Sequence, residues 1–356
     1  MPADAVRADG LPAHFESLKA RLDYPLAWRP GTPDLAAWRE QARAHVWQLT
    51  LQLADDTPFA PEVLAEEDRG DHLARRIAFN LTRDARVTGL LLLPKGDGPF
   101  PAVVMYHDHG SRFDIGKEKW ISPLQDEARL ASSQQWAAKV FEGHMPGDAL
   151  ARRGYAVFAT DALGWGERGG LDYERQQALA ANFFNLGSSL AGLMALEDTR
   201  AAAFLASLPQ IDARRLAAVG FSLGAFRAWQ ATALSDAIQA CVAVCWMARA
   251  TDLMSPGNNS IRGNSAWHMI HPGLLRELDH PDLASLAAPK PFLLYSGDAD
   301  TLFPLASVEA AAARMARVWQ AWGATEHFTH RAWPSGHTFT AEQQAAAWAW
   351  LDNTLG

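Results

Sequence analysis

Ser222, Asp300 and His337 are residues of the three types that together carry out acyl transfer through a serine nucleophile. Ser222 lies in GFSLG at 220–224, between an apolar run and a run with helical spacing. G-x-S-x-G between a strand and a helix holds the serine hydroxyl on a sharp turn, beside the free N–H groups of the helix start. The alternative is an ordinary strand-to-helix turn in which the serine only caps the helix.

An attacking serine needs a base, and the base needs an acid to orient it. Asp298 and Asp300 both follow the apolar run KPFLLYSGD at 290–298, and His337 lies in a glycine-containing loop near the C-terminus. Taken singly, each could be a loop or capping residue. Because all of them follow predicted strands in the order serine, aspartate, histidine, the sequence predicts a catalytic triad with Asp298 or Asp300 as its acid.

The elements that must position these residues alternate between strands and helices. Strands are predicted at 72–82, 86–94, 100–107, 155–161, 215–221, 237–246, 290–298 and 325–333. This alternation predicts an α/β fold with a mainly parallel central sheet covered by helices on both faces. The first two strands are expected to form an antiparallel hairpin at its edge. In such sheets ligands bind beyond the carboxyl ends of the strands, where the three residues fall.

The chain divides into an N-terminal extension and a catalytic domain. Residues 1–66 combine helix-like spacing with several prolines and predict a helical extension, whereas 67–356 carry the sheet. Within the catalytic domain, about 110–143 is an insertion expected to carry a helix. The region about 250–285 contains a stretch rich in Gly, Asn and Ser, which predicts a short lid over the site.

Aromatic and polar residues near the predicted pocket are candidate substrate contacts. Four tryptophans follow strands or lie in insertions and suggest an apolar or sugar-stacking wall, with core packing as the alternative: Trp120, Trp165, Trp246 and Trp267. In the lid, His268 and His271 are expected at the surface. Arg262 is a candidate partner for an acidic substrate group.

Composition excludes several classes of function. Lys and Arg total 32 and Asp and Glu 40, so the formal charge of −8 argues against a nucleic-acid partner. The sequence contains no run of 18 apolar residues that would predict a membrane span. The N-terminal residues lack the apolar stretch of a secretory signal peptide, so a cytoplasmic location is expected. Cys241 and Cys245 are too few for a disulfide scaffold. At a spacing of four on a strand they should share one buried face, with redox and metal roles as alternatives.

The chain resembles the α/β-hydrolase superfamily, and within it the branch of dienelactone-hydrolase-like and acetyl-xylan-esterase-like proteins. The serine motif and SGHTF at 335–339 are shared by the whole superfamily. HDHG at 107–110 and the segment from GLLRELD to LAAPKP at 273–291 are more specific to the branch. The similarity covers roughly residues 65–356.

The resemblance implies a role for each site residue. Ser222 corresponds to the nucleophile and His337 to the base. The family's spacing from a glycine to a proline selects Asp300 as the acid and leaves Asp298 as a spare. The backbone N–H groups of Leu223 and His109 correspond to the oxyanion hole. Asp108 stands where many relatives have glycine, a departure that bears on the shape of this loop.

The implied activity is a serine carboxylic ester hydrolase that acts on small acyl esters, including acetylated sugars, without a cofactor. Dienelactone hydrolase itself uses cysteine, so a serine points to ordinary esters. His107 and His109 could share a metal ion, but no further ligand motif is evident and no metal is expected. A peptidase or amidase, a thioesterase and a non-catalytic binding protein are the alternatives. The expected partner is a small-molecule ester, and the oligomeric state is left open.

Overall fold

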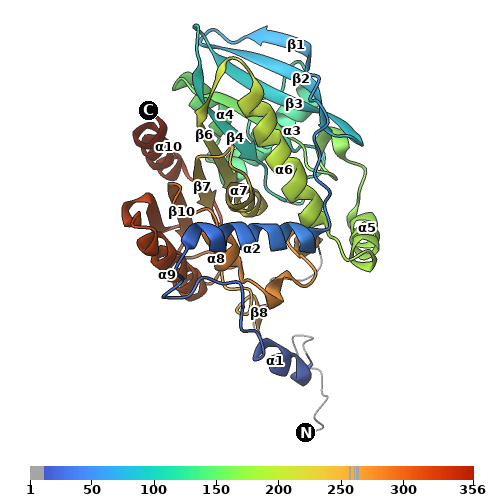
Figure 1. The fold of residues 1–356 in the computed structure, drawn as a ribbon. Coiled ribbons are helices and arrows are strands. Elements are labelled where there is room, and N and C mark those ends of the chain that lie inside the picture. The colour runs from blue at the N-terminus through green and yellow to red at the C-terminus, as the bar shows by residue number, and fades with distance from the viewer. Residues whose placement is uncertain (1–11, 256–257, 260, 262–263) are drawn as a thin grey trace.

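A nine-stranded mixed sheet forms the centre of the protein (Figure 1). The computed structural model describes residues 12–255, 258–259, 261 and 264–356. The strand order is β1-β2-β3-β5-β4-β6-β7-β10-β11. The strands are β1 (Glu62–Asp68), β2 (His72–Thr82), β3 (Ala85–Pro94), β4 (Phe100–Tyr106), β5 (Ala156–Thr160), β6 (Ile211–Phe221), β7 (Ala240–Val244), β10 (Phe292–Gly297) and β11 (Phe328–Trp333). Pairing is antiparallel from β1 to β5 and parallel from β5 to β11, which confirms the predicted mainly parallel sheet.

Helices cover both faces of the sheet because successive strand side chains point to opposite sides. Along β4, Val104 and Tyr106 belong to one apolar core, and Val103 and Met105 to the other. The first core includes residues of α2 (Leu35–Thr50), α6 (Leu190–Ser207), α7 (Leu223–Leu234), α8 (His280–Ser285) and α9 (Leu305–Ala321). The second includes residues of α3 (Glu127–Val140), α4 (Pro146–Arg152) and α10 (Ala341–Leu355).

The predicted hairpin is confirmed as β2 and β3, but it is not the edge of the sheet. β1 pairs with β2 on the outside, so residues 62–66, expected to be helical, begin a strand. β1 has the sequence EVLAEED and is largely exposed on both faces. Since it buries no apolar face, its sequence lacks the alternation by which a strand is usually recognised.

The N-terminal extension packs on the domain through α2. Asp34 caps this helix by accepting a hydrogen bond from the N–H of Ala37. Arg43 donates to the carbonyl of Ala233 at the end of α7 (2.6 Å), and Arg39 donates to that of Ala288 (3.1 Å). α1 (Ala13–Lys19) extends away from the body of the protein (Figure 1).

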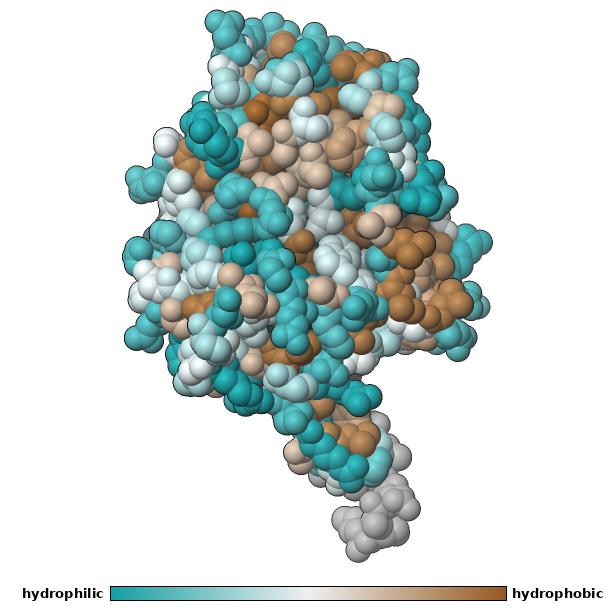
Figure 2. All heavy atoms as spheres, in the orientation of Figure 1, coloured by the Kyte–Doolittle hydropathy of each residue, from teal (hydrophilic) through white to brown (hydrophobic). Residues whose placement is uncertain are grey.

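Apolar side chains gather on the surface around α5 (Tyr173–Asn185) and the end of α2 (Figure 2). Leu51, Leu53 and Leu186 are exposed there. Among the described helices none is by itself long and apolar enough to cross a membrane, and α5 and α6 pass that test only as a pair bent by 91°. Most of α6 is buried in the core.

The two predicted insertions have defined elements. α3 is the helix expected in 110–143, preceded by a short 3-10 turn at Lys117–Lys119. The lid region holds the small pair β8 (Met254–Ser255) and β9 (Asn258–Asn259), 3-10 turns at Asn264–His268 and Leu274–Arg276, and α8.

Candidate active site

Ser222 occupies a strained turn between β6 and α7. Its φ of 54° and ψ of −129° fall in a region that residues with a side chain rarely adopt. The two glycines of the motif permit this turn by close backbone approach. A Cβ on Gly220 would lie 1.9 Å from the Gly224 oxygen, and a Cβ on Gly224 would lie 1.9 Å from the Tyr106 oxygen. The sequence GFSLG therefore fixes where the hydroxyl projects.

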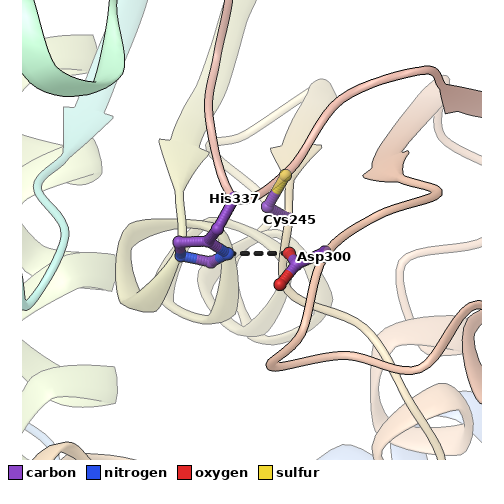
Figure 3. A group of neighbouring side chains, drawn as sticks. All are labelled: Cys245, Asp300 and His337. Carbon is purple, nitrogen blue, oxygen red and sulfur yellow. Dashed lines mark hydrogen bonds and ion pairs between the residues drawn. The ribbon is translucent and has the colours of Figure 1, made fainter.

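His337 links Ser222 to Asp300 through its two ring nitrogens. Nε2 lies 2.8 Å from Ser222 Oγ. Nδ1 lies 2.7 Å from Asp300 Oδ2, the contact drawn as a dashed line in Figure 3. The other oxygen of Asp300 accepts the N–H of Leu302 at 2.9 Å, which orients the carboxylate. Asp298 is exposed instead, so of the two candidate acids the structure brings Asp300 to the histidine.

Cys245 is the third side chain in this cluster (Figure 3). Its sulfur, an oxygen of Asp300 and a ring nitrogen of His337 lie within 4.8 Å of one another. Burial raises the pKa of the Cys245 thiol, which disfavours the nucleophilic thiolate. A metal ion between Asp300 and His337 would have to break their hydrogen bond. The cluster therefore fits a serine relay better than a thiolate or a metal site.

The expectation that both cysteines share one face of a strand is wrong. Both are buried and free, but Cys241 belongs to the core on one side of the sheet and Cys245 to the core on the other. β7 ends at Val244, and Cys245 has a φ of 58°. This left-handed residue turns the chain, so the alternation of the strand no longer applies.

The loop after β4 is held from behind by Lys119, whose ammonium is fully buried. Its Nζ donates to the carbonyls of Asp108 (2.8 Å) and His109 (3.0 Å). Trp165 Nε1 also donates to the His109 carbonyl at 3.0 Å. Because the N–H of a trans peptide points opposite to its carbonyl, the contact to Asp108 O directs the His109 N–H away from Lys119. Leu223, first in α7, has an N–H without an acceptor inside the helix.

Buried charges support this loop. Lys117 Nζ lies 2.7 Å from Asp161, whose other oxygen accepts the Lys117 N–H at 2.8 Å. Arg168 donates to the Asp161 carbonyl at 3.1 Å, so Asp161 also organises the loop that follows β5. His107 places Nδ1 2.9 Å from the Asp108 carbonyl and accepts the Ala162 N–H at Nε2. Nδ1 therefore carries the proton that it donates, and the lone pair of Nε2 already accepts a hydrogen bond. His107 has no free lone pair that could bind a metal.

A pocket of about 60 Å³ lies beside Ser222 and is walled mostly by apolar side chains. Of the four candidate tryptophans, Trp246 lines it. Trp165 is buried behind His109, Trp120 is buried against Phe141, and Trp267 packs against Phe184. These three do not line the described pocket. The rest of the apolar wall was not predicted, because no local sequence pattern distinguishes its residues from core residues: Leu253, Ile261, Met269, Leu302 and Phe303.

His268 and His271 are buried, so the prediction that they lie at the surface is wrong. The His268 ring packs against His109 and Trp165, with centroids 5.6 Å and 4.8 Å away. His271 Nε2 lies 2.6 Å from the Gln230 side-chain oxygen. A polar loop composition did not reveal that this part of the lid folds over the site. Arg262 lies outside the described residues.

These buried histidines predict a loss of stability in acid. Burial, followed by the neighbouring charge of Arg227, lowers the pKa of His268 to about 3, and burial lowers the pKa values of His109 and His271 to about 3. Between pH 6.5 and about 3 the unfolded chain binds protons that the folded protein does not, so stability falls as the pH falls. The free energy of unfolding, measured in urea, should be lower at pH 5 than at pH 7. In His268→Gln this free energy should change less with pH. An equal slope in that variant would contradict the assignment to His268.

The sheet order and the serine on its strand-to-helix turn define an α/β-hydrolase fold, as the sequence predicted. A model of the Abhydrolase family matches residues 14–338, and the chain belongs to this family. A Bacillus subtilis protein named "Putative hydrolase YtaP" is 26% identical over 304 residues, which cover 85% of this chain and 95% of that protein.

Two solved structures share the fold at low sequence identity. One, described as a putative acetyl xylan esterase of Bacteroides fragilis, has a TM-score of 0.67 and 17% identity over 93% of this chain and 85% of that chain. The other, a glucuronoyl esterase from Solibacter usitatus, has a TM-score of 0.63 and 14% identity over 100% and 98% of the two chains.

Proposed function

We propose that this protein is a serine carboxylic ester hydrolase that acts on small acyl esters, including acetylated sugars. The observation that carries the proposal is the pair of hydrogen bonds from His337 to Ser222 and Asp300, at 2.8 Å and 2.7 Å. The family membership and the ester-hydrolysing neighbours support it. The pocket beside Ser222 is small, about 60 Å³, and is walled mostly by apolar side chains, which favours a small acyl group such as acetyl.

The reaction begins with a proton transfer. His337 Nε2 takes the proton of the Ser222 hydroxyl as the oxygen attacks the ester carbonyl. Asp300 holds the imidazole in the required tautomer and stabilises its protonated form. His337 then gives the proton to the departing alcohol, which leaves an acyl group on Ser222. Water, activated by the same histidine, hydrolyses this acyl-enzyme and restores the serine.

Two backbone N–H groups stabilise the negative oxygen that forms during attack. Leu223 contributes one from the start of α7, and His109 contributes the other from the loop held by Lys119. One such donor is typically worth about 2.7–4 kcal/mol in the transition state. The His109 donor is effective because hydrogen bonds to the loop carbonyls fix its direction before substrate arrives. The direction of the Leu223 donor is set by the start of α7.

The direct test is hydrolysis of p-nitrophenyl acetate by the native protein in the presence of a chelator. We expect saturable turnover, and in a stopped-flow trace a burst of p-nitrophenol if loss of the acyl group is slow. Cys245→Ser should retain the activity, since the buried thiol takes no part in the cycle. Absence of hydrolysis by the folded native protein would contradict the proposal. Loss of activity in Cys245→Ser alone would instead assign the chemistry to the thiol.

Lys119→Met should lower kcat by about 10²–10³-fold, the usual effect of losing one oxyanion donor, with a small change in KM. The methionine fills the space but cannot hold the carbonyls of Asp108 and His109. Lys139→Met is the matched control, because the Lys139 ammonium also lies over the Trp136 ring, at 5.2 Å compared with 5.3 Å for Lys119, yet it is exposed. Equal kcat in the two folded variants would contradict this positioning role.

A further inference from the structure

A second, larger cavity of about 190 Å³ lies next to the pocket that holds Ser222. Ile261 and Met269, both from the lid region, line the two spaces. Phe226 lines the larger one and lies four residues after Ser222 on α7, about one helical turn away. The side chain of Met269 therefore stands between the nucleophile's pocket and this cavity.

The wall of the cavity is mainly apolar. Leu274, Leu278 and Leu283 are buried side chains that face it. Two polar wall groups already have partners. Asp279 accepts the N–H of Ala250 at 2.8 Å, and His271 is bonded to Gln230. His280 is the third polar wall residue, and its buried Nδ1 has no hydrogen-bond partner among the described residues. Because the rest of the lining is apolar, the cavity suits a hydrocarbon chain better than a sugar or a charged group.

The cavity lies on the side of the pocket away from the histidine. The Phe303 ring packs beside His337, with centroids 6.0 Å apart. Trp246 packs between Phe303 and Phe226, at 5.2 Å and 5.0 Å. The leaving alcohol must stay near His337 Nε2 to receive its proton. The group that points past Trp246 towards Phe226 is therefore the acyl chain.

We infer that this cavity binds the alkyl chain of a medium-length acyl group, so that esters of six- to eight-carbon acids are substrates as well as acetyl esters. The inference rests on the proposed ester hydrolysis. A cavity of about 150 Å³ lined by Leu, Ile and Phe binds benzene, so about 190 Å³ holds a chain of about six carbons. Met269 must move to admit the chain, and an unbranched methionine has the rotamers to do so.

Ala250→Leu tests this inference because the larger side chain should fill part of the cavity; this substitution is called the plug below. Ala250 lines the cavity but not the pocket of Ser222, and its backbone contact to Asp279 is retained. With p-nitrophenyl acetate, butyrate, hexanoate and octanoate, native kcat/KM should rise by up to about fourfold per methylene once the chain enters the cavity. Ala250→Leu should remove this rise and leave acetate hydrolysis unchanged. Met269→Ala should increase the preference for octanoate.

Two controls test whether the cavity itself, and the acyl side of the ester, cause the effect of the plug. Leu18→Ala changes an exposed apolar residue of the adjoining groove formed with α1, which shares Met254 and Leu275 with the cavity. Because Leu18 itself does not line the cavity, this variant should keep the native profile. Ethyl hexanoate and hexyl acetate carry the same chain on opposite sides of the ester. The plug should slow only ethyl hexanoate. If it slows only hexyl acetate, the cavity holds the alcohol and the inference is overturned.

The outcomes also distinguish this inference from the proposed function. No hydrolysis of any ester by the native protein would overturn both. Hydrolysis of acetate with no gain for longer chains, and with the same profile in Ala250→Leu, would overturn the acyl-chain inference alone. A chain-length gain that the plug abolishes supports both.

Discussion

Ser222→Ala should lower kcat for p-nitrophenyl acetate by about 10⁴–10⁶-fold, with little change in KM. The substitution removes the oxygen that forms the acyl-enzyme, whereas the pocket and the backbone N–H donors remain. Because those donors remain, the variant should still hydrolyse the ester faster than the uncatalysed reaction in water. Because alanine and serine meet similar strain at a φ of 54°, the variant should fold like the native protein.

Steady-state kinetics with purified native protein and Ser222→Ala measure this effect, and circular dichroism checks that both are folded. Cys245→Ser provides the comparison for the other nucleophile in the cluster. Retention of more than about a hundredth of native kcat in folded Ser222→Ala would show that a different residue attacks the ester, because loss of a true nucleophile costs several orders of magnitude.

Asp300→Asn should lower kcat by about 10⁴-fold, as expected when the orienting acid of a serine–histidine pair is replaced by its amide. The carboxylate lies 2.7 Å from His337 Nδ1 and requires a proton on that nitrogen. An asparagine amide can instead donate a hydrogen bond to Nδ1. The imidazole proton then lies on Nε2, and a protonated Nε2 cannot accept the proton of Ser222.

Asp298→Asn is the matched control. It makes the same change from carboxylate to amide, two residues before Asp300. Its side chain is exposed, and its backbone N–H to the Trp333 carbonyl does not depend on the carboxylate. Its kcat should stay close to native. Equal losses in the two variants, or a larger loss in Asp298→Asn, would contradict the assignment of Asp300 as the orienting acid.

The sequence alone was enough to predict eight of the nine strands of the central sheet, all but β1, and to select Ser222, His337 and one of two neighbouring aspartates. β6, β7, β10 and β11 are adjacent and parallel, so residues that follow their carboxyl ends converge on one edge. Strand periodicity and turn residues were strong signals for these segments. The choice of Asp300 over Asp298 came from family spacing, because local pattern alone does not distinguish two aspartates in one loop.

The walls and supports of the site could not be predicted in the same way. Trp120, Trp165 and Trp267 follow strands or lie in insertions as Trp246 does, but tertiary packing decides which of the four rings faces the pocket. Lys119 resembles a surface lysine in the sequence, and only the fold shows it buried against backbone carbonyls. The lid histidines lie in polar sequence, yet the lid buries them.

The most direct test of the central claim is mass spectrometry of the protein after treatment with a fluorophosphonate. We expect one covalent adduct per chain, on the peptide that contains Ser222, and none in Ser222→Ala. Labelling should be slower in Asp300→Asn, because the histidine would no longer activate the hydroxyl. No adduct on the folded native protein, or an adduct on another residue such as Cys245, would contradict Ser222 as the nucleophile.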